Sequence, residues 1–190
     1  MTEILIFHHA QGRTQGMLAF ADDLRAAGHV VHTPDLYDGN TYDDLDEGIG
    51  YAKQVGFDTI MERGRLAAEE LPNELVYAGF SLGVMPAQLL AQTRRGARGA
   101  LFFSAALPAS EFGDGWPQDL PLQIHMMEDD PWVDEDLPAA RELVADAEHA
   151  ELFLYPGDRH LFADSSLPDY DEAAARSLRE RVLSFLETTR

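Results

Sequence analysis

A five-residue segment near the middle of the chain has the composition of a nucleophile elbow. Gly79-Phe80-Ser81-Leu82-Gly83 matches the pattern G-x-S-x-G, follows an apolar run from Leu75 to Ala78, and precedes a helical pattern that begins near Val84. An elbow needs this strand–turn–helix context, with glycines where side chains would collide with the strand and the helix. The helix N-terminus would also direct backbone N–H groups at a developing oxyanion. The alternative is that Ser81 only caps the helix, but the motif in this context favours a nucleophile.

A serine nucleophile of this kind needs a histidine base, which follows an acid in chain order. Two of the seven histidines, His125 and His160, fall at predicted strand ends beyond Ser81. His125 lies inside an apolar run, which indicates a packed, hydrogen-bonded core residue. His160 lies in the loop after the last predicted strand, which is free to reach the elbow. We therefore expect His160 to be the base.

The acid should come from the loop after the penultimate strand, Met127 to Asp134, because it must hold one imidazole tautomer and stabilise the imidazolium. From position alone, Asp129 or Asp130 could take this role. Most other carboxylates of the loop are expected to face solvent. The spacing lacks the glycine and terminal glutamate of a calcium-binding EF-hand loop.

The elements that must position these residues alternate between strands and helices, which predicts a doubly wound, mostly parallel sheet of about six strands with helices on both faces. The predicted strands are Ile4 to His8, Val30 to Thr33, Leu75 to Ala78, Ala100 to Ser104, Leu122 to Met126 and Leu152 to Tyr155. The predicted helices are Met17 to Ala27, Leu45 to Leu71 as one helix or two, Met85 to Thr93, Ala139 to Ala147 and Glu172 to Leu186. The length of 190 residues suits one domain over residues 1–190.

The amino-acid composition of the chain argues against some classes of binding partner. The formal net charge is −20, from 14 basic and 34 acidic residues, and such a surface repels phosphate backbones and anionic lipid. We therefore expect no nucleic-acid and no membrane partner, and the chain has no apolar run long enough to span a bilayer. The chain contains no cysteine, which excludes disulfides and thiolate metal sites. A cytoplasmic location is the default expectation.

Taken together, these residues and their order resemble the dienelactone hydrolase family of the α/β-hydrolase superfamily. The resemblance covers nearly the whole chain, and it is specific because several short motifs occur together in order. These are Phe7-His8-His9-Ala10-Gln11-Gly12, Ala26-Ala27-Gly28-His29, Pro34-Asp35-Leu36-Tyr37, the elbow, Asp130-Pro131-Trp132-Val133, and Tyr155-Pro156-Gly157 through His160-Leu161-Phe162-Ala163. The resemblance implies the α/β-hydrolase fold. It also implies that Asp130 is the acid, and that Ala10 and Leu82 donate the two N–H groups of the oxyanion hole.

The chain departs from the better-known members of that family at several positions. They carry cysteine at the elbow, where this chain has Ser81, and a glutamate at the position of His9. Dienelactone-cleaving members hold the substrate carboxylate with arginines, one of them four residues after the catalytic histidine. Here that position is Asp164, and an aspartate is expected to repel a carboxylated substrate.

The expected chemistry is acyl transfer on a small-molecule ester or lactone, with Ser81 as nucleophile, His160 as base and Asp130 as acid. No metal or organic cofactor is required. Loop position alone makes four residues candidates for substrate binding: His9, Arg13, Tyr37 and Trp132. The alternatives are a thioesterase and a non-catalytic binding protein that retains the fold. A flavodoxin-like nucleotide binder fits poorly, since residues 9–14 hold one glycine and no lysine.

Overall fold

The computed structural model describes residues 1–189, and within them six strands form one sheet in which every neighbouring pair is parallel. The order across the sheet is β2-β1-β3-β4-β5-β6. The strands are β1 (Glu3–Phe7), β2 (Val30–His32), β3 (Val76–Phe80), β4 (Gly99–Phe103), β5 (Leu122–Met127) and β6 (Ala150–Tyr155).

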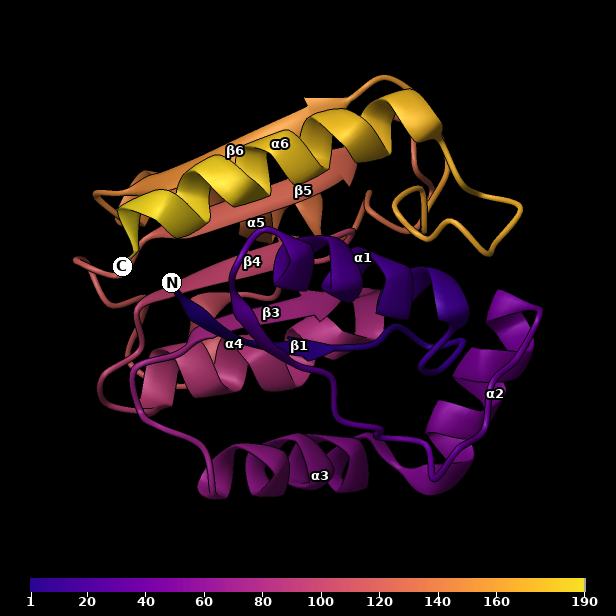
Figure 1. Cartoon of the computed structure of the whole chain (residues 1–190), viewed down its shortest axis with the longest axis horizontal. Helices are drawn as coiled ribbons and strands as arrows, with labels where there is room; N and C mark the ends of the chain where they lie inside the picture. The colour runs from indigo at the N-terminus through magenta and orange to yellow at the C-terminus, as the bar shows by residue number, and fades with distance from the viewer. Residues whose placement is uncertain (190) are drawn as a thin grey trace.

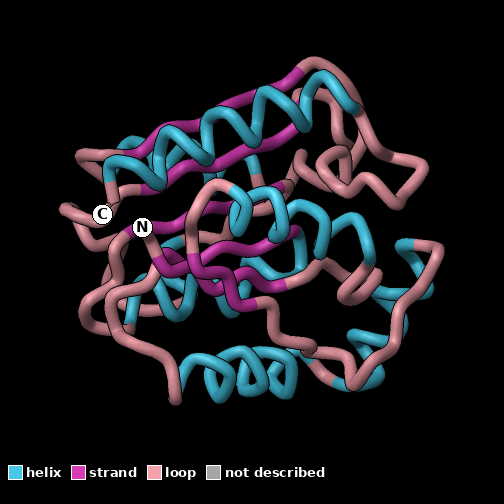
Figure 2. The backbone as a smooth tube through the Cα atoms, in the orientation of Figure 1, coloured by secondary structure: helices cyan, strands magenta, loops and turns pink. Residues whose placement is uncertain are grey.

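Helices cover both faces of this sheet, as expected (Figure 1). On one face lie α1 (Gln15–Ala26) and α6 (Glu172–Thr188), and on the other lie α3 (Phe57–Glu69), α4 (Val84–Thr93) and α5 (Leu137–Asp146). The remaining helix, α2 (Leu45–Val55), lies on the side of the molecule toward which the strand arrows point in Figure 1. The traced backbone in Figure 2 shows long loops on that same side, after β1, β2 and β6.

The strand residues alternate between two hydrophobic clusters, one on each face of the sheet. In β1, Ile4 and Ile6 belong to the cluster with α1 and α6, whereas Leu5 and Phe7 belong to the cluster with the other helices. Successive strand side chains point to opposite faces, and here both faces are buried. This explains why the strands appear in the sequence as continuous apolar runs rather than as alternating ones.

The chain reverses its direction across the sheet between β1 and β3. From β1 it moves outward to the edge strand β2 and then returns to β3 on the other side of β1. The segment after β1 therefore enters α1 on one face, and the segment after β3 enters α4 on the opposite face. In open parallel sheets the two loops diverge at such a switch point and leave a crevice at the carboxyl ends of the strands.

The predicted elements agree with the structure to within a few residues. Residues 45–71 form two helices that meet at Gly56, whose φ of 91° ends the first helix and begins the second. Strand β3 continues through Phe80, two residues beyond the predicted end, so the elbow begins inside the strand. Among the described residues, none of the helices combines the length and apolar character that a bilayer crossing requires.

Candidate active site

Ser81 occupies a strained turn between β3 and α4. Its φ is 47°, a left-handed conformation that non-glycine residues rarely adopt. The flanking glycines permit this turn because a Cβ on Gly79 would lie 2.2 Å from the Gly83 carbonyl oxygen, and one on Gly83 would lie 2.4 Å from the Phe7 carbonyl oxygen. The glycines of the G-x-S-x-G motif therefore allow the elbow to fold against itself and against the end of β1.

The structure brings His160 to this serine from a point 79 residues later in the chain. Its Nε2 lies 2.7 Å from Ser81 Oγ, and its Nδ1 lies 2.6 Å from Asp130 Oδ2. A carboxylate only accepts hydrogen bonds, so Nδ1 carries the ring proton and donates it to Asp130. In the neutral ring, Nε2 is then the free acceptor for the Ser81 hydroxyl, which is the tautomer that a general base needs.

Asp130 is distinguished from its acidic neighbours by burial. Its side chain is 1% exposed, whereas Glu128 and Asp129 are exposed to solvent. One carboxylate oxygen accepts the bond from His160, and the other accepts the Trp132 backbone N–H at 2.9 Å. These two bonds fix the carboxylate. Of the two aspartates that position alone left open, Asp130 is the one hydrogen-bonded to His160.

A serine that sequence reasoning missed holds the backbone of His160. Ser104 follows β4, has a φ of 61°, and donates its hydroxyl to the His160 carbonyl at 2.5 Å. Its own N–H bonds the His125 carbonyl. No motif in the sequence marks Ser104, because its partner carbonyl lies in the loop after β6, 56 residues later in the chain.

The two residues predicted to form the oxyanion hole lie on segments that touch each other. Leu82 follows Ser81 in a short 3-10 turn, Ser81–Gly83, and Gly83 packs against the carbonyls of Phe7 and His8 at the end of β1. Ala10 follows directly in the loop after β1, is almost fully buried, and lies within a turn closed by a bond from the Gly12 N–H to the His9 carbonyl.

Of the four predicted substrate-binding residues, two are in the interior, which corrects the expectation that they line an open crevice. Tyr37 is 0% exposed, and its ring packs edge-on against His8 and Tyr51. His9 is also 0% exposed, and its Nε2 lies 2.8 Å from Asp164 Oδ2. Loop position alone cannot distinguish a side chain that faces a crevice from one that packs beneath it.

The other two candidates are exposed. Trp132 is 48% exposed, and its ring centroid lies 6.0 Å from that of His160, at the edge of the candidate site. Arg13 donates to the Thr33 carbonyl at 3.1 Å, just past the end of the edge strand β2.

Asp164 does not present a free charge to a substrate, contrary to the expectation from its position. It is 2% exposed, and its two oxygens take four hydrogen bonds, from His9, Thr14 and both the backbone and hydroxyl of Ser166. Burial alone would raise its pKa, but the bonds from His9, Ser166 and Thr14 outweigh that effect and lower the pKa to about 2.

A further carboxylate, Asp136, lies close enough to His160 to interact with it electrostatically. Burial raises the pKa of Asp136, opposed by a hydrogen bond from the Ala106 N–H at 3.4 Å. It stands at the N-terminus of α5. Sequence reasoning assigned this residue no role.

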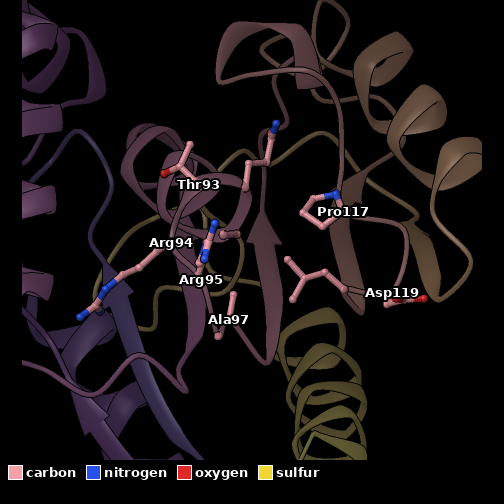
Figure 3. Close-up of a pocket in the computed structure, with 10 residues that line it drawn as sticks. Thr93, Arg94, Arg95, Ala97, Pro117 and Asp119 are labelled. Atoms are coloured by element: carbon pink, nitrogen blue, oxygen red, sulfur yellow. The ribbon is translucent and has the colours of Figure 1, made fainter.

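The cavity drawn in Figure 3 lies away from Ser81, toward the amino ends of β4 and β5. It has a volume of about 280 Å³ and is lined by the end of α4 and by the segment before β5, and Figure 3 shows its side chains. Arg94 extends away from Pro117 and Asp119 there (Figure 3), and its guanidinium bonds the Tyr77 hydroxyl and the Leu71 carbonyl. Since α4 has 10 residues, this cavity is separated from the elbow by about 15 Å of helix.

No group of three or more histidine, aspartate or glutamate side chains among residues 1–189 is arranged so that it could hold a metal ion.

Comparisons with known proteins bear on the family and on the fold. The family model described as the dienelactone hydrolase family matches residues 1–190. A search of curated proteins gave no match.

Solved structures share the fold at low sequence identity. A dienelactone hydrolase from Anabaena variabilis is 16% identical, with a TM-score of 0.68 and coverage of 98% of this chain and 86% of that one. A dienelactone hydrolase-like promiscuous phosphotriesterase from metagenomic libraries is 17% identical, with a TM-score of 0.75 and coverage of 100% and 87%. A cold-adapted esterase from an Arctic intertidal metagenomic library is 16% identical, with a TM-score of 0.66 and coverage of 99% and 83%. At these identities, the likeness speaks to the fold.

Proposed function

The chain belongs to the dienelactone hydrolase family, and we propose that it is a serine hydrolase that cleaves an ester or lactone of a small molecule through an acyl-enzyme on Ser81. The observation that carries this proposal is the continuous chain of hydrogen bonds from Asp130 through His160 to Ser81, with distances of 2.6 and 2.7 Å. A general base must lie within this reach of the proton it takes.

In the first half-reaction, Ser81 Oγ attacks the carbonyl carbon while its proton passes to His160 Nε2. The carbonyl oxygen becomes an oxyanion, which the N–H groups of Ala10 and Leu82 stabilise; one such donor is typically worth about 3 to 4 kcal/mol. The C–O bond to the leaving group then breaks, and His160 returns the proton to the departing oxygen. Asp130 stabilises the imidazolium between these steps.

In the second half-reaction, water replaces the leaving group. His160 Nε2 takes a proton from the water as its oxygen attacks the acyl carbon, and the collapse of the second tetrahedral intermediate returns the proton to Ser81. The products are a carboxylic acid and the free enzyme. No step draws on a cofactor.

The electrostatics of the site favour neutral substrates. The loop after β5 carries Glu128, Asp129, Asp134 and Glu135, all exposed, and the whole chain has a formal net charge of −20. These charges lower the local concentration of anions. The one arginine among the predicted binding residues, Arg13, donates a hydrogen bond to the Thr33 carbonyl. We therefore propose an uncharged acyl group.

Turnover of a small panel tests this proposal. The panel contains p-nitrophenyl acetate, p-nitrophenyl butyrate, a six-membered lactone and an acyl thioester. Ser81→Ala should lower kcat/KM for every substrate that the wild type cleaves by at least about 1,000-fold. The exposed Ser110 supplies the matched control, since Ser110→Ala should leave the rates unchanged.

The same panel separates the alternatives. A thioester preferred over the oxygen esters by more than tenfold would favour a thioesterase, because the triad does not select the leaving group. Absence of Ser81-dependent turnover across the whole panel would contradict the proposal and favour a binding protein that keeps the hydrolase fold.

A further inference from the structure

The buried pair His9–Asp164 joins two loops that carry different parts of the proposed catalytic machinery. His9 immediately precedes Ala10, and Asp164 lies four residues after His160. Their side chains meet at 2.8 Å, and both are nearly or completely excluded from solvent. The proposed mechanism gives neither side chain a role, so the presence of this buried polar pair beside the site has to be explained in another way.

The hydrogen bonds around His9 define its tautomer. The Gln11 backbone N–H points at His9 Nδ1 at 3.2 Å, so Nδ1 must accept and carries no proton. Nε2 is then the protonated nitrogen, and it donates to Asp164. The neighbouring His8 has the opposite arrangement: its Nδ1 bonds the His9 carbonyl at 2.8 Å, and its Nε2 accepts the Leu36 N–H at 3.0 Å. The loop that carries Ala10 is thus held on two sides by two neutral histidines.

Asp164 is held at the N-terminus of α1. Thr14, the N-cap of that helix, accepts the Met17 N–H at 3.3 Å and directs its own hydroxyl at Asp164. The fit is close, because a Cβ on Gly16 would lie 1.8 Å from Asp164 Oδ1. A carboxylate at this end of a helix is favoured by the helix dipole. Asp164 is therefore a rigid point to which the loop after β1 can be fixed.

Asp164 also shapes the segment that presents His160. Its backbone N–H bonds the Leu161 carbonyl at 3.0 Å, which closes the turn after His160. The side chain of Ser166 bonds both Asp164 Oδ1 and the Gly16 N–H, at 2.7 and 3.0 Å. A displacement of Asp164 would therefore move the His160 segment relative to the Ala10 segment.

We propose that His9 and Asp164 are positioning residues that fix the distance between the oxyanion-binding Ala10 amide and the His160 base during attack by Ser81. This inference rests on the proposed function of the site. It differs from a purely structural role because it concerns an interaction made in the transition state. An oxyanion donor acts only when it lies at hydrogen-bond distance from the place where charge develops, and a misplacement of about 1 Å can lower a rate by about 100-fold.

The test compares His9→Leu with His9→Gln in steady-state hydrolysis of p-nitrophenyl acetate. Leucine removes the link to Asp164, whereas glutamine can place a side-chain N–H near the same carboxylate. We expect His9→Leu to lower kcat by about 30- to 100-fold with KM changed by less than about threefold, as for a group that acts in the transition state. His9→Gln should recover kcat to within about fivefold of the wild type.

Asp164→Asn gives an independent arm. Asp164 is the acceptor in all four of its hydrogen bonds, two on each carboxylate oxygen. The NH₂ group of an asparagine would therefore face a donor in either orientation of the side chain. We expect kcat to fall by at least about tenfold. If His9→Leu does not fold, this arm and His9→Gln carry the test.

Inhibition by phenylboronic acid supplies a readout that a loss of stability does not change. Its tetrahedral adduct with serine places an oxygen in the oxyanion hole, so its Ki should rise in proportion to the fall in kcat. The control is Tyr77→Phe, which removes the bond between the Tyr77 hydroxyl and Arg94 near the amino end of β3. It should lower Tm and leave both kcat and Ki unchanged.

The outcomes separate this inference from the proposed function. Wild-type turnover that depends on Ser81, combined with a kcat of folded His9→Leu within threefold of the wild type, would overturn the positioning role alone. A fall in kcat that His9→Gln does not recover, or that phenylboronic acid affinity does not follow, would overturn it as well. Absence of Ser81-dependent turnover in the wild type would overturn both.

Discussion

Replacing Asp130 by asparagine should impose the wrong tautomer on His160. One oxygen of Asp130 accepts the Trp132 N–H at 2.9 Å, and the other accepts the His160 Nδ1–H at 2.6 Å. In Asp130→Asn the carbonyl oxygen must stay on Trp132, because the NH₂ group cannot accept a hydrogen bond. The NH₂ group then faces Nδ1 and donates to it. The ring proton consequently moves to Nε2, which faces Ser81 Oγ at 2.7 Å and can no longer accept a proton.

The magnitude follows from what the variant must do to react. Recovering the productive tautomer places two donors opposite each other in a site where Asp130 is 1% exposed. In this tautomer the variant lacks the charge-assisted hydrogen bond of the wild type, worth about 2 to 3 kcal/mol. It also leaves a buried donor unsatisfied, at a cost of about 2 to 3 kcal/mol. Together these raise the barrier by about 4 to 6 kcal/mol, which lowers kcat by about 1,000- to 25,000-fold.

Initial-rate hydrolysis of p-nitrophenyl acetate checks this, with thermal unfolding run in parallel. The matched control is Asp129→Asn, an exposed neighbour with the same chemistry, which should change kcat by less than twofold. A folded Asp130→Asn variant that keeps kcat within tenfold of the wild type would refute the tautomer reasoning.

Three further predictions concern packing, pH and substrate binding. Gly83→Ala should cost about 3 kcal/mol or more, seen as a Tm lower by about 6 to 12 °C, because its Cβ would lie 2.4 Å from the Phe7 carbonyl oxygen; an unchanged Tm would contradict the packing. Burial lowers the pKa of His8 to about 4 and that of His125 to about 3. Below pH 6.5 the unfolded chain therefore binds more protons than the folded chain, and the free energy of unfolding falls as the pH is lowered. Urea titrations should show a loss of about 4 kcal/mol between pH 7 and pH 5, about 2 for each histidine; a flat profile would argue against their burial. Trp132→Ala should raise KM by about three- to tenfold with little change in Tm, because the ring is exposed beside His160; an unchanged KM would remove Trp132 from the binding site.

The sequence predicted those features that a pattern of neighbouring residues encodes. The elbow was identified because Gly79, Ser81 and Gly83 lie within five residues of one another. Only the contact that requires Gly79 is local, since Gly83 packs against Phe7, far earlier in the chain. The strands were located because both of their faces are buried, which produces apolar runs. His125 was interpreted as a core histidine from its place in such a run, and it is buried against Tyr155 with a bond of 2.9 Å.

The remaining parts of the site depend on contacts between distant segments, which no local pattern encodes. Asp164 was expected to face a substrate, yet its partners His9 and Thr14 lie about 150 residues earlier. Tyr37 was expected in a crevice because it follows a strand, but its ring fills the core beneath the loops. Ser104 carried no signal in the sequence, since its partner is a backbone carbonyl 56 residues later in the chain.

The central claim is that Ser81 is a nucleophile activated by His160. Labelling with a fluorophosphonate probe, followed by peptide mass spectrometry, measures this most directly. We expect one adduct, on the peptide that contains Ser81. It should be absent in Ser81→Ala and should form much more slowly in His160→Gln. An adduct on another residue, or folded wild-type protein that stays unlabelled under conditions that label a known serine esterase, would contradict it.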